Sequence, residues 1–421
     1  MSGLTNTLES SRHVKILSTA TRKPRRSTMM PLDTWVPFRP DDKDLEAIAN
    51  DVAEISDIQR RLVEKHDDLK MPDRVAHQYQ IAGGKVALTL ADKIPQELEG
   101  VGIFEPGSKY ICIGRVSGGL GWPHVETYPD ILGIMLAVQT RGGERVDFLG
   151  ISDPAAPAGN HRDFMDVLYA SAEAAGADFP LAGHPDDVGD LIAAKAAFAA
   201  ALTKRMGFFK GLTALAHLAR QSFRSFSSST AYDTYWTDVV EVGNTAGKFI
   251  FAPTTHENRG AAFRKGERHL TEDWRRRQTR GSVDFGLCWL PFRNQQETPT
   301  TDFTRKWREQ HMTRIGTVTF PQIDPESEEA RLWAALASEI GANQGNWIHG
   351  KGNTITEPAT EFGVARKIAY QKSQDGRDAL KPDLYRSVFE TGEISPDLAR
   401  ELRRRRSKKE SAGHVSWAPG R

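Results

Sequence analysis

The order of strand-like and helix-like segments constrains the fold of this chain more than any other sequence feature. Apolar and β-branched residues punctuated by Gly and Pro recur in two blocks, residues 74–153 and 238–325, and Ala-rich helical sequence separates them at residues 160–226. The strand-like segments read KVALTLADKI, KYICIGRVS, ILGIMLAVQT, RVDFLGI, GKFIFAP, GSVDFGLCWLPF and RIGTVTFPQ. Strands in two blocks around a helical insertion predict an α+β fold, in which helices surround a closed antiparallel β-barrel.

Charge and cysteine content argue against several classes of protein. The 421 residues include 56 Lys and Arg and 55 Asp and Glu, whereas a general nucleic-acid-binding protein would be basic overall. Cys112 and Cys288 lie in strand-like segments, and two cysteines make neither a disulfide framework nor a metal-ligand cluster, so buried thiols are expected. No apolar signal sequence is visible at the N-terminus, and no window of about 18 residues is apolar enough for a transmembrane helix. We therefore expect a cytoplasmic protein with no nucleic-acid partner.

The chain is predicted to form one large domain between two basic ends. Residues 1–40 are predicted to be a poorly ordered arm that contains RKPRRS, and residues 381–421 a basic tail, disordered at its end, that contains RRRRSKK. Between them, residues 41–380 are predicted to form the folded domain, with a helical insertion at about 160–230. The sequence leaves the oligomeric state open.

One part of the insertion, residues 191–232, has no Asp or Glu, and its basic residues alternate with Phe. A basic amphipathic segment of this kind can lie on an anionic lipid surface. It can equally form helices that bury their apolar faces on the barrel and leave their cations in solvent, which is the interpretation we favour. The residues concerned are Lys195, Phe198, Lys204, Arg205, Phe208, Phe209, Lys210, Arg220, Phe223, Arg224 and Phe226.

A trio of residues near the C-terminus carries the first chemical signal. At about 100° per residue, Arg366, Tyr370 and Arg377 fall on one helix face, within roughly 40° of each other. Positive charge on both sides of a phenol favours the phenolate, which is the form of Tyr that binds haem iron. A solvated helix face is the alternative, because Arg four residues before Tyr is common on such faces.

Other motifs occur upstream in an order that gives the trio weight. DRVAH ends at His77, and GIFEPGSKYICIGRVSGG follows with Arg115 and Ser117. The next motifs are GIMLAVQTRGGERVDFLGISDP, AYDTYWTDVVEVGNTAGKFIFAP and GNWIHG. Together they resemble the haem-dependent catalases, and most closely the shorter bacterial catalase-like proteins, over residues 60–378. The order and spacing of the motifs carry this resemblance, since no single motif is highly specific.

The resemblance implies a haem b site with the following roles. Tyr370 is the proximal ligand of the haem iron, and Arg366 holds its phenolate. His77 is the distal acid–base group, and Ser117 fixes its tautomer. The remaining candidates for contact with haem are Arg74, Arg115 and Arg377, which suit its propionates, and Phe164.

The chain departs from the catalase pattern in the distal pocket. GISDP has no Asn where the family places one over the iron, AAPAGN replaces a Phe-rich run, and Leu132 and Val116 replace a family Arg and Phe. We therefore expect an oxidoreductase that decomposes hydrogen peroxide or organic hydroperoxides, with fatty-acid hydroperoxides included. A haem carrier or sensor with little turnover, and a haem-free scaffold, are the alternatives.

Overall fold

A computed structural model describes most of the chain in one compact unit, Thr34–Arg421. The described residues are 35–64, 74–119, 126, 130–140, 142–174, 188–222, 234–254, 268–346 and 356–411. Most of the predicted N-terminal arm, and the WIHG portion of the GNWIHG motif, lie outside these ranges. No helix in the described ranges has the length and apolar character needed to cross a bilayer.

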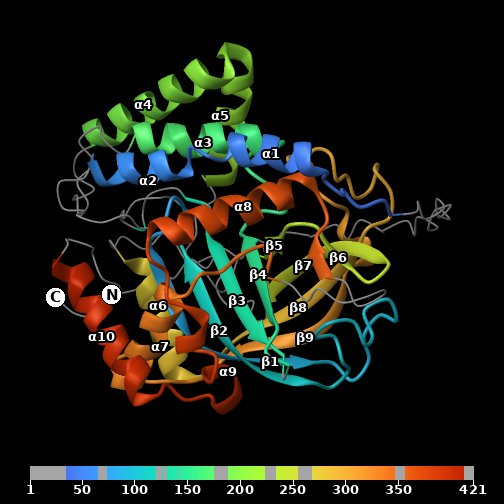
Figure 1. Cartoon of the computed structure of the whole chain (residues 1–421), viewed down its shortest axis with the longest axis vertical. Coiled ribbons are helices and arrows are strands. Elements are labelled where there is room, and N and C mark those ends of the chain that lie inside the picture. The colour runs from blue at the N-terminus through green and yellow to red at the C-terminus, as the bar shows by residue number, and fades with distance from the viewer. Residues whose placement is uncertain are drawn as a thin grey trace, which may run out of the picture. The chain divides into compact units, whose positions relative to one another are not determined.

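Eight strands form a closed antiparallel β-barrel with helices around it, as predicted (Figure 1). The sheet closes because β1 pairs with β2 on one edge and β9 on the other, while β7 pairs with β5 and β8. In order around the barrel the strands are β1 (Gln80–Leu90), β2 (Lys109–Ser117), β3 (Gly133–Gln139), β4 (Arg145–Ile151), β5 (Tyr235–Thr237), β7 (Thr245–Pro253), β8 (Val283–Pro291) and β9 (Thr313–Phe320). Two short strands, β6 (Val240–Val242) and β10 (Thr356–Pro358), extend the edge of β7.

The barrel interior is a packed aromatic core. Strand alternation sends Phe249 and Phe251 of β7 inward, whereas Ile250 between them packs in a separate cluster on the outer face. The ring of Phe148 meets Phe249 edge-on at 5.1 Å between centroids. Because large side chains fill the interior, a site for a small molecule has to lie on the outside of this barrel.

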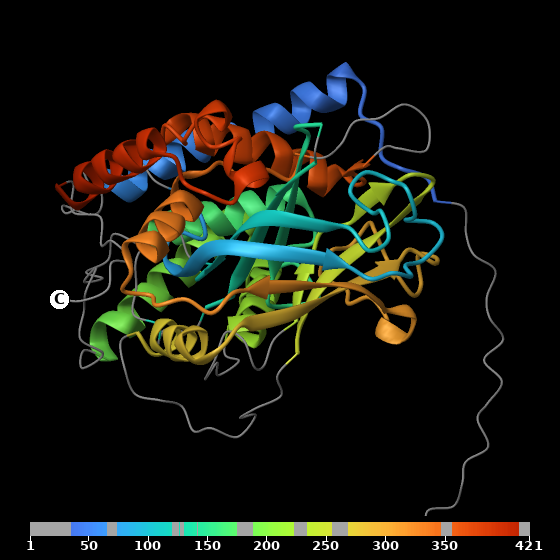
Figure 2. The same cartoon turned by 90° about the horizontal axis from the view of Figure 1, so that it is seen from below.

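Helices cover the outer face of the barrel. The helices are α1 (Asp42–Asp51), α2 (Ile55–Glu64), α3 (His161–Ala174), α4 (Val188–Met206), α5 (Phe208–Ser222), α6 (His269–Arg280), α7 (Glu328–Glu339), α8 (Glu361–Gly376), α9 (Val388–Thr391) and α10 (Pro396–Ser411), with the 3₁₀ turns Glu309–His311 and Pro382–Leu384. Figure 1 shows α1 to α5 as a layer on one side, with α8 between this layer and the barrel. On another side α7 packs against β1 and β2, as Figure 2 shows from below.

The C-terminal region is more ordered than the predicted basic tail. The arginine-rich run lies in α10, where Leu398 and Leu402 are buried in a cluster with Trp333 of α7. Arg405 donates to Glu401 and to the main-chain carbonyl of Asp378. The basic residues therefore occupy one face of a packed helix, because the apolar residues of α10 recur at helical spacing on its other face. Residues 412–421 lie outside the described ranges.

Candidate functional site

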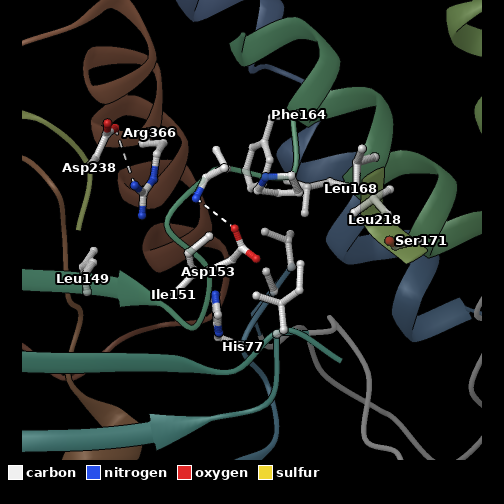
Figure 3. A pocket seen from close by; sticks show the side chains of 18 of the residues that line it. His77, Leu149, Ile151, Asp153, Phe164, Leu168, Ser171, Leu218, Asp238 and Arg366 are labelled. Carbon is white, nitrogen blue, oxygen red and sulfur yellow. Dashed lines mark hydrogen bonds and ion pairs between the residues drawn. The ribbon is translucent and has the colours of Figure 1, made fainter. Parts of the chain in front are cut away.

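A cavity of about 400 Å³ lies between the outer face of the barrel and helices α3, α5 and α8 (Figure 3). Its walls are mainly apolar, with Phe164, Leu168 and Leu218 among them. A smaller cavity of about 70 Å³ shares His77, Arg366 and Tyr370 with it. A largely apolar cavity of this size, with a few convergent polar groups, is typical of small-molecule and cofactor sites.

The backbone at His77 is held in an unusual conformation. His77 has a φ of +56°, a left-handed conformation that is uncommon for residues other than Gly. Its N–H donates to the carbonyl of Gly119, and its own carbonyl accepts a hydrogen bond of 2.6 Å from Arg115. Strained backbone of this kind concentrates at functional sites, where the surrounding structure determines it.

Two neighbours fix the imidazole of His77. Its Nδ1 lies 3.3 Å from the Ser117 hydroxyl, as the predicted pair requires. On another side the ring lies against Gly133, where an added Cβ would come within 2.5 Å of both Cε1 and Nδ1. Gly133 thus provides the space that the imidazole occupies, and Figure 3 shows the ring directed into the cavity.

The environment of His77 keeps the imidazole neutral. His77 lines both cavities. Burial, followed by the positive charge of Arg115, lowers the pKa of His77 to about 4, although Asp130 opposes the shift. A neutral imidazole in a cavity is able to accept a proton from a ligand at pH 7.

Tyr370 and Arg366 lie on α8 and line the same two cavities as His77. The helix begins after Thr360, whose hydroxyl accepts a hydrogen bond from the N–H of Gly363. One turn apart on this helix, Arg366 donates to the Tyr370 hydroxyl at 3.1 Å, as the sequence spacing predicts. Arg377 ends the helix as its C-cap and is the member of the trio that does not contact the phenol in the hydrogen bonds of the described residues.

Asp238, which the sequence analysis did not predict as part of the site, forms an ion pair with Arg366. Oδ2 of Asp238, in the turn between β5 and β6, lies 3.6 Å from Nη1 of Arg366. Figure 3 shows this ion pair at the edge of the cavity. Burial works against the charge of Arg366, but Tyr370 and Asp238 together raise its pKa above the ordinary value. The guanidinium that faces the phenol is therefore a permanent cation.

The arginines proposed for propionates line the smaller cavity but also bond to the chain itself. Arg74 donates to the carbonyl of Ser338 at 2.6 Å, and Arg377 donates to that of Ile340 at 2.9 Å. Arg115 donates to Gln80 as well as to His77. These bonds hold the segment around His77 to the sheet and to the end of α7.

Phe164, the predicted aromatic contact, lines the larger cavity from α3. Its ring packs edge-on against Phe362 at 5.6 Å between centroids.

Two further charged groups reach the larger cavity without having been predicted. Asp153 directs its carboxylate into the cavity and accepts a hydrogen bond of 2.9 Å from the N–H of Ala155 (Figure 3). Lys248, on the outer face of β7, is only 5 % exposed and lies over the ring of Trp307. Burial lowers the pKa of Lys248 to about 8, with Asp238 and Asp153 opposing the shift. Two sequence features could have indicated these residues: Lys248 is a Lys inside an otherwise apolar strand, and Asp153 follows the end of a strand.

Solved structures of catalases share this fold. A fungal catalase matches with a TM-score of 0.55 and 13% identity, over 76% of this chain and 61% of that chain. A bacterial catalase matches with a TM-score of 0.53 and 15% identity, over 88% and 66% of the two chains. Catalase A from Saccharomyces cerevisiae matches with a TM-score of 0.53 and 13% identity, over 78% and 64%.

The catalases that match are longer than this chain, which spans about two thirds of their length. No model of a known protein family matches the sequence, and neither does any curated protein. The chain therefore has the catalase fold. At such low identity the likeness concerns fold alone, and it does not single out the shorter bacterial catalase-like proteins.

Proposed function

We propose that this chain is a haem-dependent enzyme, similar to catalases and peroxidases, that decomposes hydrogen peroxide or organic hydroperoxides. The observation that carries the proposal is that one cavity system is bounded both by Tyr370, bonded to Arg366, and by a neutral His77 beside Ser117. The two pairs lie far apart in the sequence; the Arg366–Tyr370 pair was expected from helical spacing and the His77–Ser117 pair from the resemblance to catalases. The catalase fold supports the proposal by analogy.

The donor set fits a haem ligated by Tyr. The phenol oxygen of Tyr370 accepts a hydrogen bond from a permanent cation, which is the environment that stabilises a phenolate ligand. Arg74, Arg115 and Arg377 line the smaller cavity and suit the two propionates. The apolar walls that include Phe164 suit the porphyrin ring. When bound, the haem iron supplies the redox chemistry that breaks the O–O bond.

The protein contributes proton transfer and exclusion of water. His77, neutral at pH 7, accepts the proton from one peroxide oxygen and returns it to the other, which leaves as water or as an alcohol. Ser117 holds the ring orientation through Nδ1, so that the other nitrogen is available to the ligand. Arg366 remains cationic and donates a hydrogen bond to Tyr370.

The distal wall favours organic hydroperoxides over hydrogen peroxide. Ile151 lines both cavities in the stretch where the catalase pattern has an amide donor. Losing one preorganised donor costs about 3 kcal/mol of transition-state stabilisation, on the order of a hundredfold in rate. The apolar side chains of α3 and α5, among them Val167 and Leu215, suit a larger apolar substrate such as a fatty-acid hydroperoxide.

Ile151 also favours a second candidate function, a haem-binding carrier or sensor with little turnover. The test is an absorption spectrum of the full chain expressed with adequate haem, followed by assays on that preparation with hydrogen peroxide, cumene hydroperoxide and a fatty-acid hydroperoxide. We expect a Soret band and faster consumption of the two organic substrates. A Soret band without turnover supports the carrier, and the absence of haem binding overturns both proposals.

A further inference from the structure

Exposed apolar side chains concentrate at one point of the molecule, the junction of α4 and α5. Among the described residues, the large hydrophobic side chains that are exposed are Val36, Leu45, Phe208, Phe209, Leu212 and Leu384. Half of them belong to the first turns of α5, where Phe208 is 65% and Phe209 is 84% exposed. We call Phe208, Phe209 and Leu212 the α5 tip. Clustered exposed aromatic residues mark an interaction surface more often than scattered ones do.

The α5 tip has a fixed shape. Gly207, with a φ of +80°, turns the chain between α4 and α5. Gly211 then lies so close to α4 that an added Cβ would come within 2.7 Å of Cα of Thr203. The rings of Phe208 and Phe209 pack edge-on with centroids 5.5 Å apart. The two helices therefore hold the aromatic pair outward instead of leaving it on an adaptable loop.

The other face of the same helices accounts for the packing that the sequence predicted. Leu202 of α4 is buried against α3, with Leu215 and Leu218 of α5 packed around it. Leu215 and Leu218 also line the large cavity. The residues of the α5 tip contribute to neither surface in the described structure, so their apolar character needs a different explanation.

Exposed lysines flank the α5 tip along the chain. Lys204, in the last turn of α4, and Lys210, in the first turn of α5, are exposed, and the sequence has no Asp or Glu from residue 191 to residue 232. Acidic groups come only from neighbouring elements within the described contacts: Asp163 pairs with Lys210, while Glu54 and Asp166 pair with Arg205. Lys204 thus adds positive charge beside the aromatic pair.

We propose that the α5 tip docks on an anionic lipid surface. Phe and Leu side chains that insert at the headgroup boundary, beside Lys and Arg that attract anionic headgroups, are the features of interfacial helices. A second copy of this chain is disfavoured as the occupant, because a two-fold contact through the tip brings the cations of both copies together. The patch is small, so the attachment is reversible, and each cation near the surface adds about fivefold in affinity.

The experiment is vesicle co-sedimentation of the full chain, with phosphatidylcholine vesicles and with phosphatidylcholine–phosphatidylserine vesicles. We expect binding to the anionic vesicles that weakens as salt rises. Phe208→Ser/Phe209→Ser should reduce binding at least tenfold, and Lys204→Glu should reduce it on anionic vesicles alone. The matched control is Val36→Ser/Leu384→Ser, which removes two exposed apolar residues elsewhere and should leave binding unchanged.

Equal binding by the tip variant and the control variant overturns the proposal, as does a lack of binding by the unaltered chain. Sedimentation velocity distinguishes the other occupant: self-association that the tip variant abolishes, without vesicle binding, assigns the tip to a second copy. Circular dichroism melting of each variant shows whether its fold is retained. Haem binding and peroxide turnover in solution do not depend on the tip, so the two proposals fail separately.

Discussion

His77 and Arg366 line the same two cavities, yet their surroundings shift the pKa of His77 down and the pKa of Arg366 up. Burial and nearby cations lower the pKa of His77 to about 4 and remove its charge. Arg366 is buried too, but Tyr370 and Asp238 raise its pKa and secure its charge. Burial is the largest cause of the shift at His77, whereas at Arg366 the neighbouring groups outweigh burial and add to a pKa that is high in any Arg. In the proposed function, His77 exchanges a proton and Arg366 keeps its positive charge.

Replacing Tyr370, which accepts a hydrogen bond from Arg366, should have the largest effect on the proposed haem site. Tyr370→Phe removes the oxygen that Arg366 contacts at 3.1 Å, and with it the proposed iron ligand. We expect loss of most bound haem, measured as the haem-to-protein ratio after expression with excess haem. The control is Tyr169→Phe, because Tyr169 uses its ring to contact Arg61 and Arg205 and should retain normal haem content. A haem-replete Tyr370→Phe protein would remove Tyr370 from the site.

Replacing the proton-exchanging group should spare haem and slow the chemistry. We choose His77→Asn because Asn tolerates the left-handed backbone found at this position. General acid–base groups contribute on the order of 10²- to 10⁴-fold, and the rate of peroxide reaction should fall within that range. His311→Asn, at a more exposed His remote in sequence, provides the control for stopped-flow measurements. Unchanged peroxide kinetics in His77→Asn would contradict the assignment.

The depressed pKa of His77 also predicts how stability depends on pH. Between about pH 6.5 and pH 4 the unfolded chain binds a proton at this His and the folded chain does not. Stability therefore falls as pH falls through this interval, by up to about 3 kcal/mol in total, and is fully retained above about pH 6.5. Urea unfolding at several pH values measures the slope, which should be shallower in His77→Asn. Parallel slopes in the two proteins would show that folding does not lower the pKa of His77.

The smallest effect should come from replacing Asp238, which pairs with Arg366 and so acts on Tyr370 only indirectly. Asp238→Asn removes the carboxylate charge beside two buried cations, Arg366 and Lys248. We expect the free energy of unfolding to fall by about 1–3 kcal/mol. The control Asp383→Asn removes a highly exposed partner of Arg386 and should change stability by less than about 0.5 kcal/mol.

The double variant Asp238→Asn/Lys248→Met sharpens this test. Removing the second cation together with the carboxylate should recover part of the lost stability, because one fewer buried charge is then left without compensation. If neither variant differs from the unaltered chain in chemical denaturation, the Asp238 carboxylate does not support the charge on Arg366.

The sequence predicts the long strands of this fold but misses its short strands, and it also misses helix α6 (His269–Arg280), which lies inside a block predicted as strands. Strands such as β1 and β7 carry enough alternating residues to be recognised, whereas β5, β6 and β10 have three residues each. The packing of α10 also escaped prediction, because its arginines dominate the composition while only a few apolar residues at helical spacing are buried. Local pattern is informative only where it extends over several turns or pleats.

The candidate site divides in the same way. The Arg366–Tyr370 contact follows from helical spacing, and the closeness of His77 and Ser117 was expected from the resemblance to catalases. Asp153 and Lys248 could not be assigned to the cavity from sequence. A polar residue after a strand, such as Asp153, normally reads as part of a turn, and a Lys inside a strand, such as Lys248, normally reads as a solvent-facing position. Their placement depends on how the helices cover the barrel, which no local pattern encodes.

The close fit of His77 against Gly133 has a consequence for recognising this site in other chains. A position that carries no functional group decides whether the imidazole has room, since a Cβ at residue 133 would overlap the ring. A chain that keeps His and Ser but replaces this Gly with Ala is therefore expected to retain the signature and lose the geometry. To recognise this site in another chain, one therefore has to check for a Gly at the position of Gly133 as well as for the His and the Ser.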